Sequence, residues 1–191
     1  MSKKINVITL GCSKNLVDTE VMLHKLNSAG FEITPNEEEA EIIVINTCGF
    51  IDDAKKEAID NILYAVSLKE EGIIKGVVVT GCLAERYQQE ILNEMPEVDA
   101  VVGIGANGEI AEICKKVIEG NKVAEFPSKY CMPLEGDRIL STPSHYAYLK
   151  IAEGCSNHCT YCAIPKIRGR LTRCDFMQHH AKHINVILKI I

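Results

Sequence analysis

The chain of 191 residues contains no tryptophan, and aromatic residues make up only 5% of it. Its core must therefore consist mainly of aliphatic side chains. The chain also lacks a strong excess of either charge, because its formal net charge is only −5. That balance argues against a protein that binds nucleic acid over its whole surface. Long apolar runs are absent as well, so we expect no membrane-spanning helix.

No secretory signal is recognised near the amino end. The apolar run Ile5–Leu10 is too short for the central part of such a signal, and it contains Asn6. We therefore expect a cytoplasmic protein with no membrane partner and no direct nucleic-acid binding by this chain. Thiols stay reduced in that compartment. The nine cysteines are odd in number and too few for a disulfide scaffold, so they indicate metal or redox chemistry.

Short β-branched runs alternate with helical patterns along the first 120 residues. The runs are apolar enough for strands buried on both faces, and they cover Ile5–Leu10, Glu41–Asn46, Gly76–Thr80 and Ala100–Val102. Patterns with helical periodicity follow them, over Asn15–Ala29, Asp52–Glu71, Ala84–Glu94 and Asn107–Glu119. The alternation predicts an α/β fold, with a parallel sheet covered by helices on both faces, as one domain over residues 1–120.

The pattern changes after Gly120. Residues 121–144 contain three prolines and little periodicity, which is typical of a linker. A strand is predicted over Tyr146–Ile151, at the start of a second domain over residues 145–170. Residues 171–191 form a tail of different composition, for which we predict a helix. A solvated tail is favoured there over a metal site, although four potential ligands are present: Cys174, His179, His180 and His183.

Three cysteines each follow the end of a predicted strand: Cys12, Cys48 and Cys82. The carboxyl ends of parallel strands share one edge of a sheet, and neighbouring strands lie about 4.8 Å apart. We therefore expect the three thiols to converge there, beside helix amino termini that favour thiolates. Gly11 and Gly81 would allow the backbone to approach a ligand closely.

The alternative is that these cysteines are small buried apolar residues, as free cysteines often are. Three of them at equivalent strand ends favour a metal site over that alternative. Two other cysteines fit no set. We expect Cys114 in the core, because it lies on a helical stripe, and Cys131 is left without a role.

A second set, Cys155, Cys159 and Cys162, has the spacing C-x3-C-x2-C in a predicted loop. Structural zinc requires four ligands, and His158 is the nearest candidate for the fourth, although it lies between two of the cysteines. Three cysteines on a [4Fe–4S] cluster instead leave one iron without a protein ligand. A substrate or cofactor can bind such an open position.

The spacing of this second set, with the aromatic Tyr161 before its last cysteine, resembles the signature of radical S-adenosylmethionine enzymes. In that superfamily the open iron binds the amino and carboxylate groups of S-adenosylmethionine. The aromatic residue commonly lies near the adenine, so the resemblance implies that role for Tyr161.

Four longer stretches resemble the methylthiotransferase family: LGCSKNLVDTEVM, VINTCGFIDDAKKEAI, VVVTGCLAERY and YLKIAEGCSNHCTYCAIPKIRG. The family joins a three-cysteine amino-terminal domain to a radical S-adenosylmethionine barrel. The resemblance implies two [4Fe–4S] clusters, one on Cys12, Cys48 and Cys82 that supplies or binds sulfur, and one on the second set. It also implies that residues 145–170 are the first strand and cluster loop of the barrel.

The stretches after Cys12 and Cys48 are most similar to the branch that methylthiolates an aspartate of the twelfth small-subunit ribosomal protein. That protein is then the implied partner, together with an electron donor such as flavodoxin or ferredoxin. The resemblance ends near residue 170, so we interpret the chain as a truncated enzyme. Two alternatives stay open, namely a tRNA adenosine methylthiotransferase of the same family and a non-catalytic iron–sulfur fragment.

Overall fold

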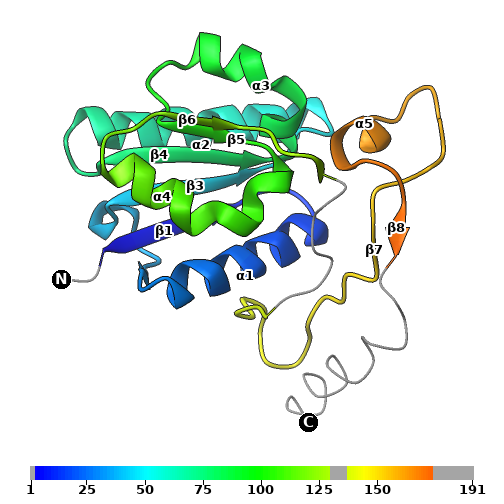
Figure 1. Cartoon of the computed structure of the whole chain (residues 1–191), viewed down its shortest axis with the longest axis horizontal. Coiled ribbons are helices and arrows are strands. Elements are labelled where there is room, and N and C mark those ends of the chain that lie inside the picture. Colours follow the sequence, from blue (N-terminus) through cyan, green and yellow to red (C-terminus); the bar gives the residue numbers. More distant parts are fainter. Residues whose placement is uncertain (1–2, 130–136, 174–191) are drawn as a thin grey trace.

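The computed structural model describes residues 3–129 and 137–173. A parallel sheet with flanking helices forms its larger part (Figure 1). The strands of this sheet are β1 (Lys4–Thr9), β2 (Glu32–Ile33), β3 (Ile42–Thr47), β4 (Gly76–Gly81), β5 (Ala100–Val102) and β6 (Val123–Glu125). The long helices are α1 (Ser13–Ser28), α2 (Asp52–Glu70), α3 (Cys82–Glu94) and α4 (Ile110–Ile118), with short 3-10 helices at Glu37–Glu39 and Ile104–Glu109.

The strand order is β2-β1-β3-β4-β5-β6, and every pairing in this sheet is parallel. The chain adds β2 on one side of β1 and β3 on the other, so the direction of strand addition reverses between β1 and β3. In open α/β sheets, ligands bind at the carboxyl edge beside such a reversal. The predicted fold class is therefore confirmed, and its topology directs attention to the ends of β1 and β3.

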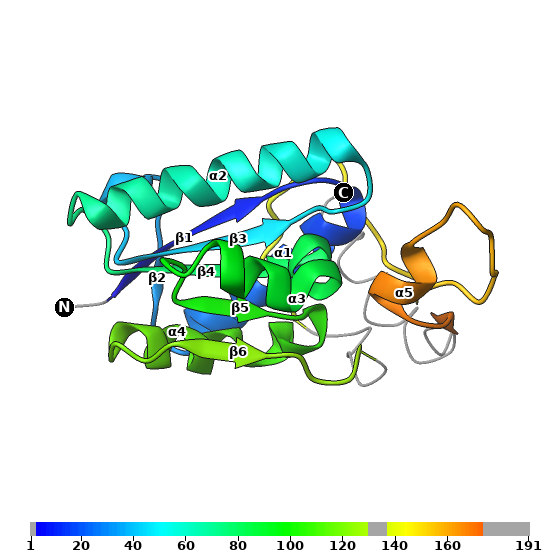
Figure 2. The ribbon, with the colours of Figure 1, turned by 90° about the horizontal axis from the view of Figure 1, so that it is seen from above.

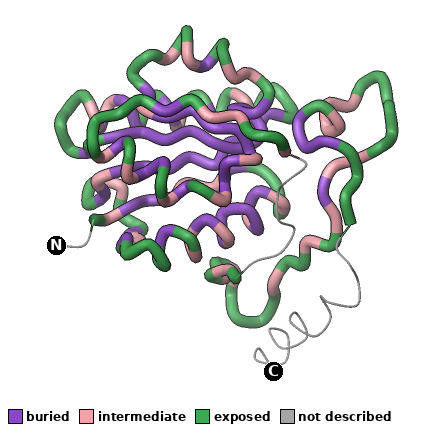
Figure 3. Tube along the Cα trace, viewed as in Figure 1, coloured by how far each residue is buried: buried purple, intermediate pink, exposed green. Residues whose placement is uncertain are grey.

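Helices cover both faces of the sheet (Figure 2). On one face α2 and α3 pack through Ile62, Ala65 and Ile91. On the other face α1 and α4 pack through side chains that include Met22 and Ile113. All six residues of β3 and all six of β4 are buried, as Figure 3 shows for the central strands. Their continuous apolar sequence is thus explained by burial on both faces.

Two edge strands escaped the sequence-based prediction. β2 has two residues and β6 has three, which is too short for either periodicity to be recognised. β6 pairs with β5 through Ala100 and Val123. It lies inside the segment that was expected to be a linker, so the sheet uses part of that segment as its sixth strand.

The strand predicted over Tyr146–Ile151 is wrong in its position. These residues have no regular secondary structure, and Tyr146, Tyr148 and Ile151 are exposed. The adjacent strand is instead β7 (Ala152–Glu153), which pairs antiparallel with β8 (Thr172–Arg173). Apolar alternation suggested a strand, but no described strand lies beside residues 146–151 to complete a ladder.

The predicted tail lies mostly outside the described residues. Its first residues form β8 rather than the predicted helix, and Cys174, His179, His180 and His183 lie beyond them. Cys131 is likewise outside the described residues. Within the described ranges, no helix combines the length and the apolar character needed to cross a membrane.

Candidate metal centre

The first three cysteines follow the ends of three adjacent strands. Cys12 is the N-cap of α1 after β1, Cys48 follows β3 directly, and Cys82 is the first residue of α3 after β4. β3 pairs with both β1 and β4. The expected convergence on one edge of the sheet is therefore confirmed for the backbone positions, with two of the cysteines at helix amino termini.

Gly11 and Gly81 hold this edge in a conformation that other residues rarely adopt, because their φ angles are +91° and +95°. A Cβ atom on Gly11 would lie 2.5 Å from Cys48 Cβ and 2.8 Å from Cys48 Sγ. One on Gly81 would collide with the backbone of Thr47. Gly11 thus allows the end of β1 to approach the Cys48 thiol, and Gly81 allows the end of β4 to approach Thr47. The predicted close approach to a ligand stays a prediction.

Asn15 joins the ends of these strands. Its side-chain nitrogen donates hydrogen bonds to the carbonyl oxygens of Leu10 at 2.8 Å and of Thr47 at 3.0 Å. The Cys82 thiol lies 3.6 Å from its oxygen, Oδ1, as a donor. Asn15 is fully buried. Its sequence position suggested only the beginning of a helix, so its role in this edge was missed.

The three thiols differ in their exposure. Cys12 is exposed, whereas Cys48 and Cys82 are 8% and 7% exposed. Burial raises the pKa of Cys82 to about 11, although the nearby Arg168 guanidinium opposes that rise. The thiol of the metal-free chain is therefore protonated at neutral pH. A metal that binds Cys82 must displace this proton.

The second set lies in the loop between β7 and α5 (Ile164–Arg168). The Cys155 backbone N–H donates to the Gly169 carbonyl at 3.0 Å, and the Cys162 N–H donates to the Cys159 carbonyl at 3.1 Å. The sulfur-bearing side chains are open to ligands, because Cys159 is exposed and the other two are of intermediate exposure. The loop is thus tied at its backbone and accessible at its thiols.

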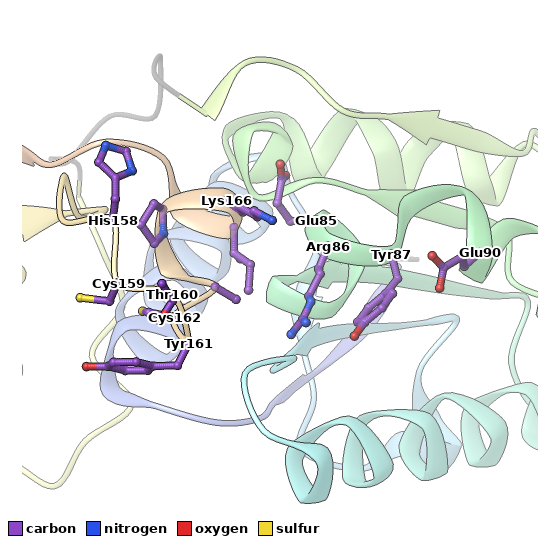
Figure 4. Close-up of a pocket in the computed structure, with 13 residues that line it drawn as sticks. Glu85, Arg86, Tyr87, Glu90, His158, Cys159, Thr160, Tyr161, Cys162 and Lys166 are labelled. Atoms are coloured by element: carbon purple, nitrogen blue, oxygen red, sulfur yellow. The ribbon is translucent and has the colours of Figure 1, made fainter.

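His158 does not complete this set as a zinc ligand. Its ring points away from the sulfurs of Cys159 and Cys162 (Figure 4). Among residues 3–129 and 137–173, no three histidine, cysteine, aspartate or glutamate side chains are gathered closely enough to hold one metal ion. The donor chemistry of three thiols at adjacent strand ends nevertheless fits a cluster that is larger than a single ion.

A cavity of about 640 Å³ separates α3 from the second cysteine loop (Figure 4). Arg86 and Tyr87 line it on the side of α3, and Tyr161 and Cys162 line it on the side of the loop. The Arg86 guanidinium also donates to the Gly49 carbonyl at 3.0 Å, next to Cys48. Because α3 begins at Cys82, this helix connects the first cysteine set to the wall of the cavity.

Buried charges fasten the second cysteine segment to α1. The Arg168 guanidinium lies 2.9 Å from the Asp18 carboxylate and 2.8 Å from that of Glu153. Lys150 pairs with the same two carboxylates at 2.6 and 2.5 Å. Burial alone would raise the pKa of Glu153, but Arg168 and Lys150 outweigh it and hold the pKa at about 2. None of these partners was recognised from the sequence.

Residues 4–103 match the family described as "Uncharacterized protein family UPF0004". The chain belongs to this family. The matched stretch runs from β1 to the end of β5, so it contains Cys12, Cys48 and Cys82 but not the second set.

Curated relatives extend the match across the second cysteine set. A ribosomal protein uS12 methylthiotransferase RimO of Lachnoclostridium phytofermentans is 52% identical over 167 residues, which cover 87% of this chain and 38% of the relative. The RimO proteins of Caldicellulosiruptor saccharolyticus and Clostridioides difficile are 49% and 48% identical, with 88% and 87% of this chain covered.

The chain therefore spans about two fifths of the length of these relatives, since 39% and 38% of the latter two are matched. The resemblance to the RimO-type methylthiotransferases is confirmed. The structure gives the positions of the six cysteines of the two sets, whereas their role as cluster ligands stays a prediction.

Proposed function

We propose that this chain forms part of a radical S-adenosylmethionine methylthiotransferase that modifies an aspartate of ribosomal protein uS12. One observation carries the proposal. The helix α3 connects the two sets of three cysteines. It begins at Cys82 of the first set, and it lines a cavity together with Cys159 and Cys162 of the second set. The names of the relatives, whose matches cover 87–88% of this chain, support the same reaction.

In this proposal Cys12, Cys48 and Cys82 hold one [4Fe–4S] cluster, and Cys155, Cys159 and Cys162 hold a second one. The three cysteines of the second set would leave one position of their cluster open for S-adenosylmethionine, and the exposed Tyr161 ring would be available to contact the adenine. When bound, these groups supply a carbon radical and the sulfur that replaces an unactivated hydrogen. A reaction of this kind suits a carbon that has no acidic proton for a base to remove.

The residues of the chain then have separable tasks. Gly11 lets the end of β1 approach Cys48, and Gly81 lets the end of β4 approach the backbone of Thr47, so the strand ends that carry the cysteines lie close together. Arg86 fixes α3 against the loop after Cys48 and presents its guanidinium to the cavity. A cation at that wall suits a carboxylate-bearing substrate. The enclosed position of Cys48 and Cys82 limits the access of water to a reactive intermediate.

We further propose a cytoplasmic location, where ribosomal protein uS12 is made, and an electron donor such as flavodoxin or ferredoxin. A tRNA substrate is the competing possibility within the family. Assays of the whole protein on ribosomes and on tRNA separate the two. Methylthiolation of tRNA without modification of uS12 would overturn the proposed substrate.

The cluster assignment is tested by anaerobic reconstitution and counting of iron. Two clusters give about eight iron atoms per chain. Replacement of Cys12, Cys48 and Cys82 by alanine removes about half of that iron, and the same change in the second set removes the other half. Cys114→Ala, a matched control in the core, leaves the iron content unchanged. A chain that binds one zinc and no iron contradicts the proposal.

A further inference from the structure

Arg168 lies in α5, and its side chain is only 5% exposed. Besides its ion pairs with Asp18 and Glu153, it donates a hydrogen bond from Nη2 to the Asn15 side-chain oxygen. Its planar guanidinium thus contacts two carboxylates and one amide at once. A lysine in this place has one charged nitrogen and cannot reproduce that fork of contacts.

Charge balance alone does not explain this arrangement. Asp18 and Glu153 supply two negative charges. Three cations face them, namely Lys150, Arg168 and the partly exposed Lys14, which lies 3.2 Å from Glu153. Lys150 pairs with the same two carboxylates, and Arg168 in addition donates to the side-chain oxygen of Asn15. The contact with Asn15 links the buried arginine to the first cysteine set, because the same Asn15 oxygen faces the Cys82 thiol.

Asn15 connects Arg168 to the first cysteine set. The same oxygen that accepts from Arg168 faces the Cys82 thiol, and the amide nitrogen holds the ends of β1 and β3. At the other end, Glu153 precedes Cys155 by two residues, and its carboxylate accepts the Gly154 N–H at 3.0 Å. One buried path of hydrogen bonds thus runs from the second cysteine loop through Arg168 to Cys82.

We propose that Arg168 is a positioning residue that couples the two cysteine sites, because it holds Asn15 against Cys82 and places a buried positive charge beside the first site. A positive charge near a cluster favours its reduced form, so Arg168 raises the reduction potential of the cluster at Cys12, Cys48 and Cys82. The inference rests on the proposed function, since it requires a cluster at that site. It predicts that the second cysteine segment tunes the first cluster even when no second cluster is bound.

The test uses the 191-residue chain with Cys155, Cys159 and Cys162 replaced by alanine, so that one cluster remains. The midpoint potential of this cluster is measured by an anaerobic redox titration, followed by electron paramagnetic resonance. We expect Arg168→Gln to shift the potential to more negative values, with at least a tenfold change in the ratio of reduced to oxidised cluster, or about 59 mV for a one-electron couple. Arg168→Lys, which keeps the charge, shifts it less.

Arg170→Gln is the matched control, because Arg170 lies two residues after Arg168 and is exposed. The cluster of the Arg170→Gln variant is expected to have the same midpoint potential as that of the parent chain. Equal potentials for the folded Arg168→Gln and Arg170→Gln variants overturn the inference and leave the proposed function intact. If Arg168→Gln does not fold, the midpoint potentials of Arg168→Lys and Arg170→Lys are compared instead. We then expect a smaller negative shift for Arg168→Lys alone, and equal potentials overturn the inference. A parent chain that takes up no cluster overturns the proposed function, and the inference with it.

Discussion

The two described parts of the chain are stabilised in different ways. In residues 3–129 the sheet is held by aliphatic side chains, and strands such as β3 are buried along their whole length. In residues 137–173, Ile167 is the only apolar side chain that is fully buried. That segment is held instead by ions, including Arg168 on Asp18 and Arg138 on Glu20.

The helix α1 takes part in both kinds of contact. Its Met22 and Leu26 side chains pack in the core, whereas its buried Asp18 and Glu20 face the carboxyl-terminal segment. The Glu20 carboxylate accepts hydrogen bonds from the backbone and hydroxyl of Ser141 at 2.8 and 3.1 Å. The sheet therefore depends on apolar area, and the attachment of the segment depends on pairing of charges that cannot be left alone in the interior.

The largest expected effect comes from the apolar core. Ile45 in β3 has no exposed surface, so Ile45→Ala should lower the free energy of unfolding by about 4 kcal/mol. Ile151→Ala, at a side chain that is 68% exposed in the carboxyl-terminal segment, should change it by less than about 0.5 kcal/mol. Urea denaturation measures both. Equal losses would contradict the contrast between the two parts.

The second prediction concerns the strand edge beside the cysteines. Gly81→Ala should cost about 3 kcal/mol, because it combines a positive φ angle with a collision against Thr47. Gly72→Ala is the control. Gly72 also has a positive φ, but a Cβ there meets no atom within 4 Å, so only the conformational cost of about 1 kcal/mol remains. Thermal unfolding distinguishes the two variants, and similar costs would refute a crowded edge.

The third prediction addresses the charged attachment. Asp18→Asn leaves Arg168 and Lys150 with one carboxylate, which should weaken the attachment by about 2 kcal/mol and speed amide hydrogen exchange in residues 164–168 roughly 30-fold. Exchange in β3 should not change. The exposed pair of Glu112 with Lys115 serves as the control, and Glu112→Gln should have almost no effect. Faster exchange throughout the sheet would show that the two parts unfold together.

The smallest effect is expected at Cys114. Burial raises its pKa to about 12, above the ordinary value of 9.0. The folded chain thus favours the neutral thiol. The resulting contribution to stability is present below about pH 9 and is lost as the pH rises from there towards 12. At pH 8 in the metal-free chain, iodoacetamide should label the exposed Cys12 and not Cys114, as mass spectrometry can show. Equal labelling of the two would place Cys114 outside the core.

The sequence allowed the sheet to be predicted because its information is local. Four strands and their helices carry periodic or continuous apolar patterns, and the cysteines follow three of these strands directly. β2 and β6 were missed because two or three residues carry no period. The segment Tyr146–Ile151 alternates like a strand, but a strand also requires a neighbour, and no local pattern specifies one.

The polar contacts of the site could not be predicted for a different reason. Asn15 and Arg168 are separated by 153 residues of sequence, and Asn15 and Cys82 are separated by 67. Charged side chains are usually exposed, so nothing in the sequence marked Asp18 or Arg168 as buried. Only the three-dimensional arrangement shows that these residues share one path.

The distance along the chain between Asp18 and Arg168 also sets an order in time. The two are 150 residues apart, so at 5–20 residues per second the ribosome makes Arg168 about 8–30 s after Asp18. Until then, the acidic side of α1 must remain hydrated while its apolar side can already dock on β1 and β3. Synthesis therefore favours a pathway in which the sheet forms first and the second cysteine loop docks onto it afterwards.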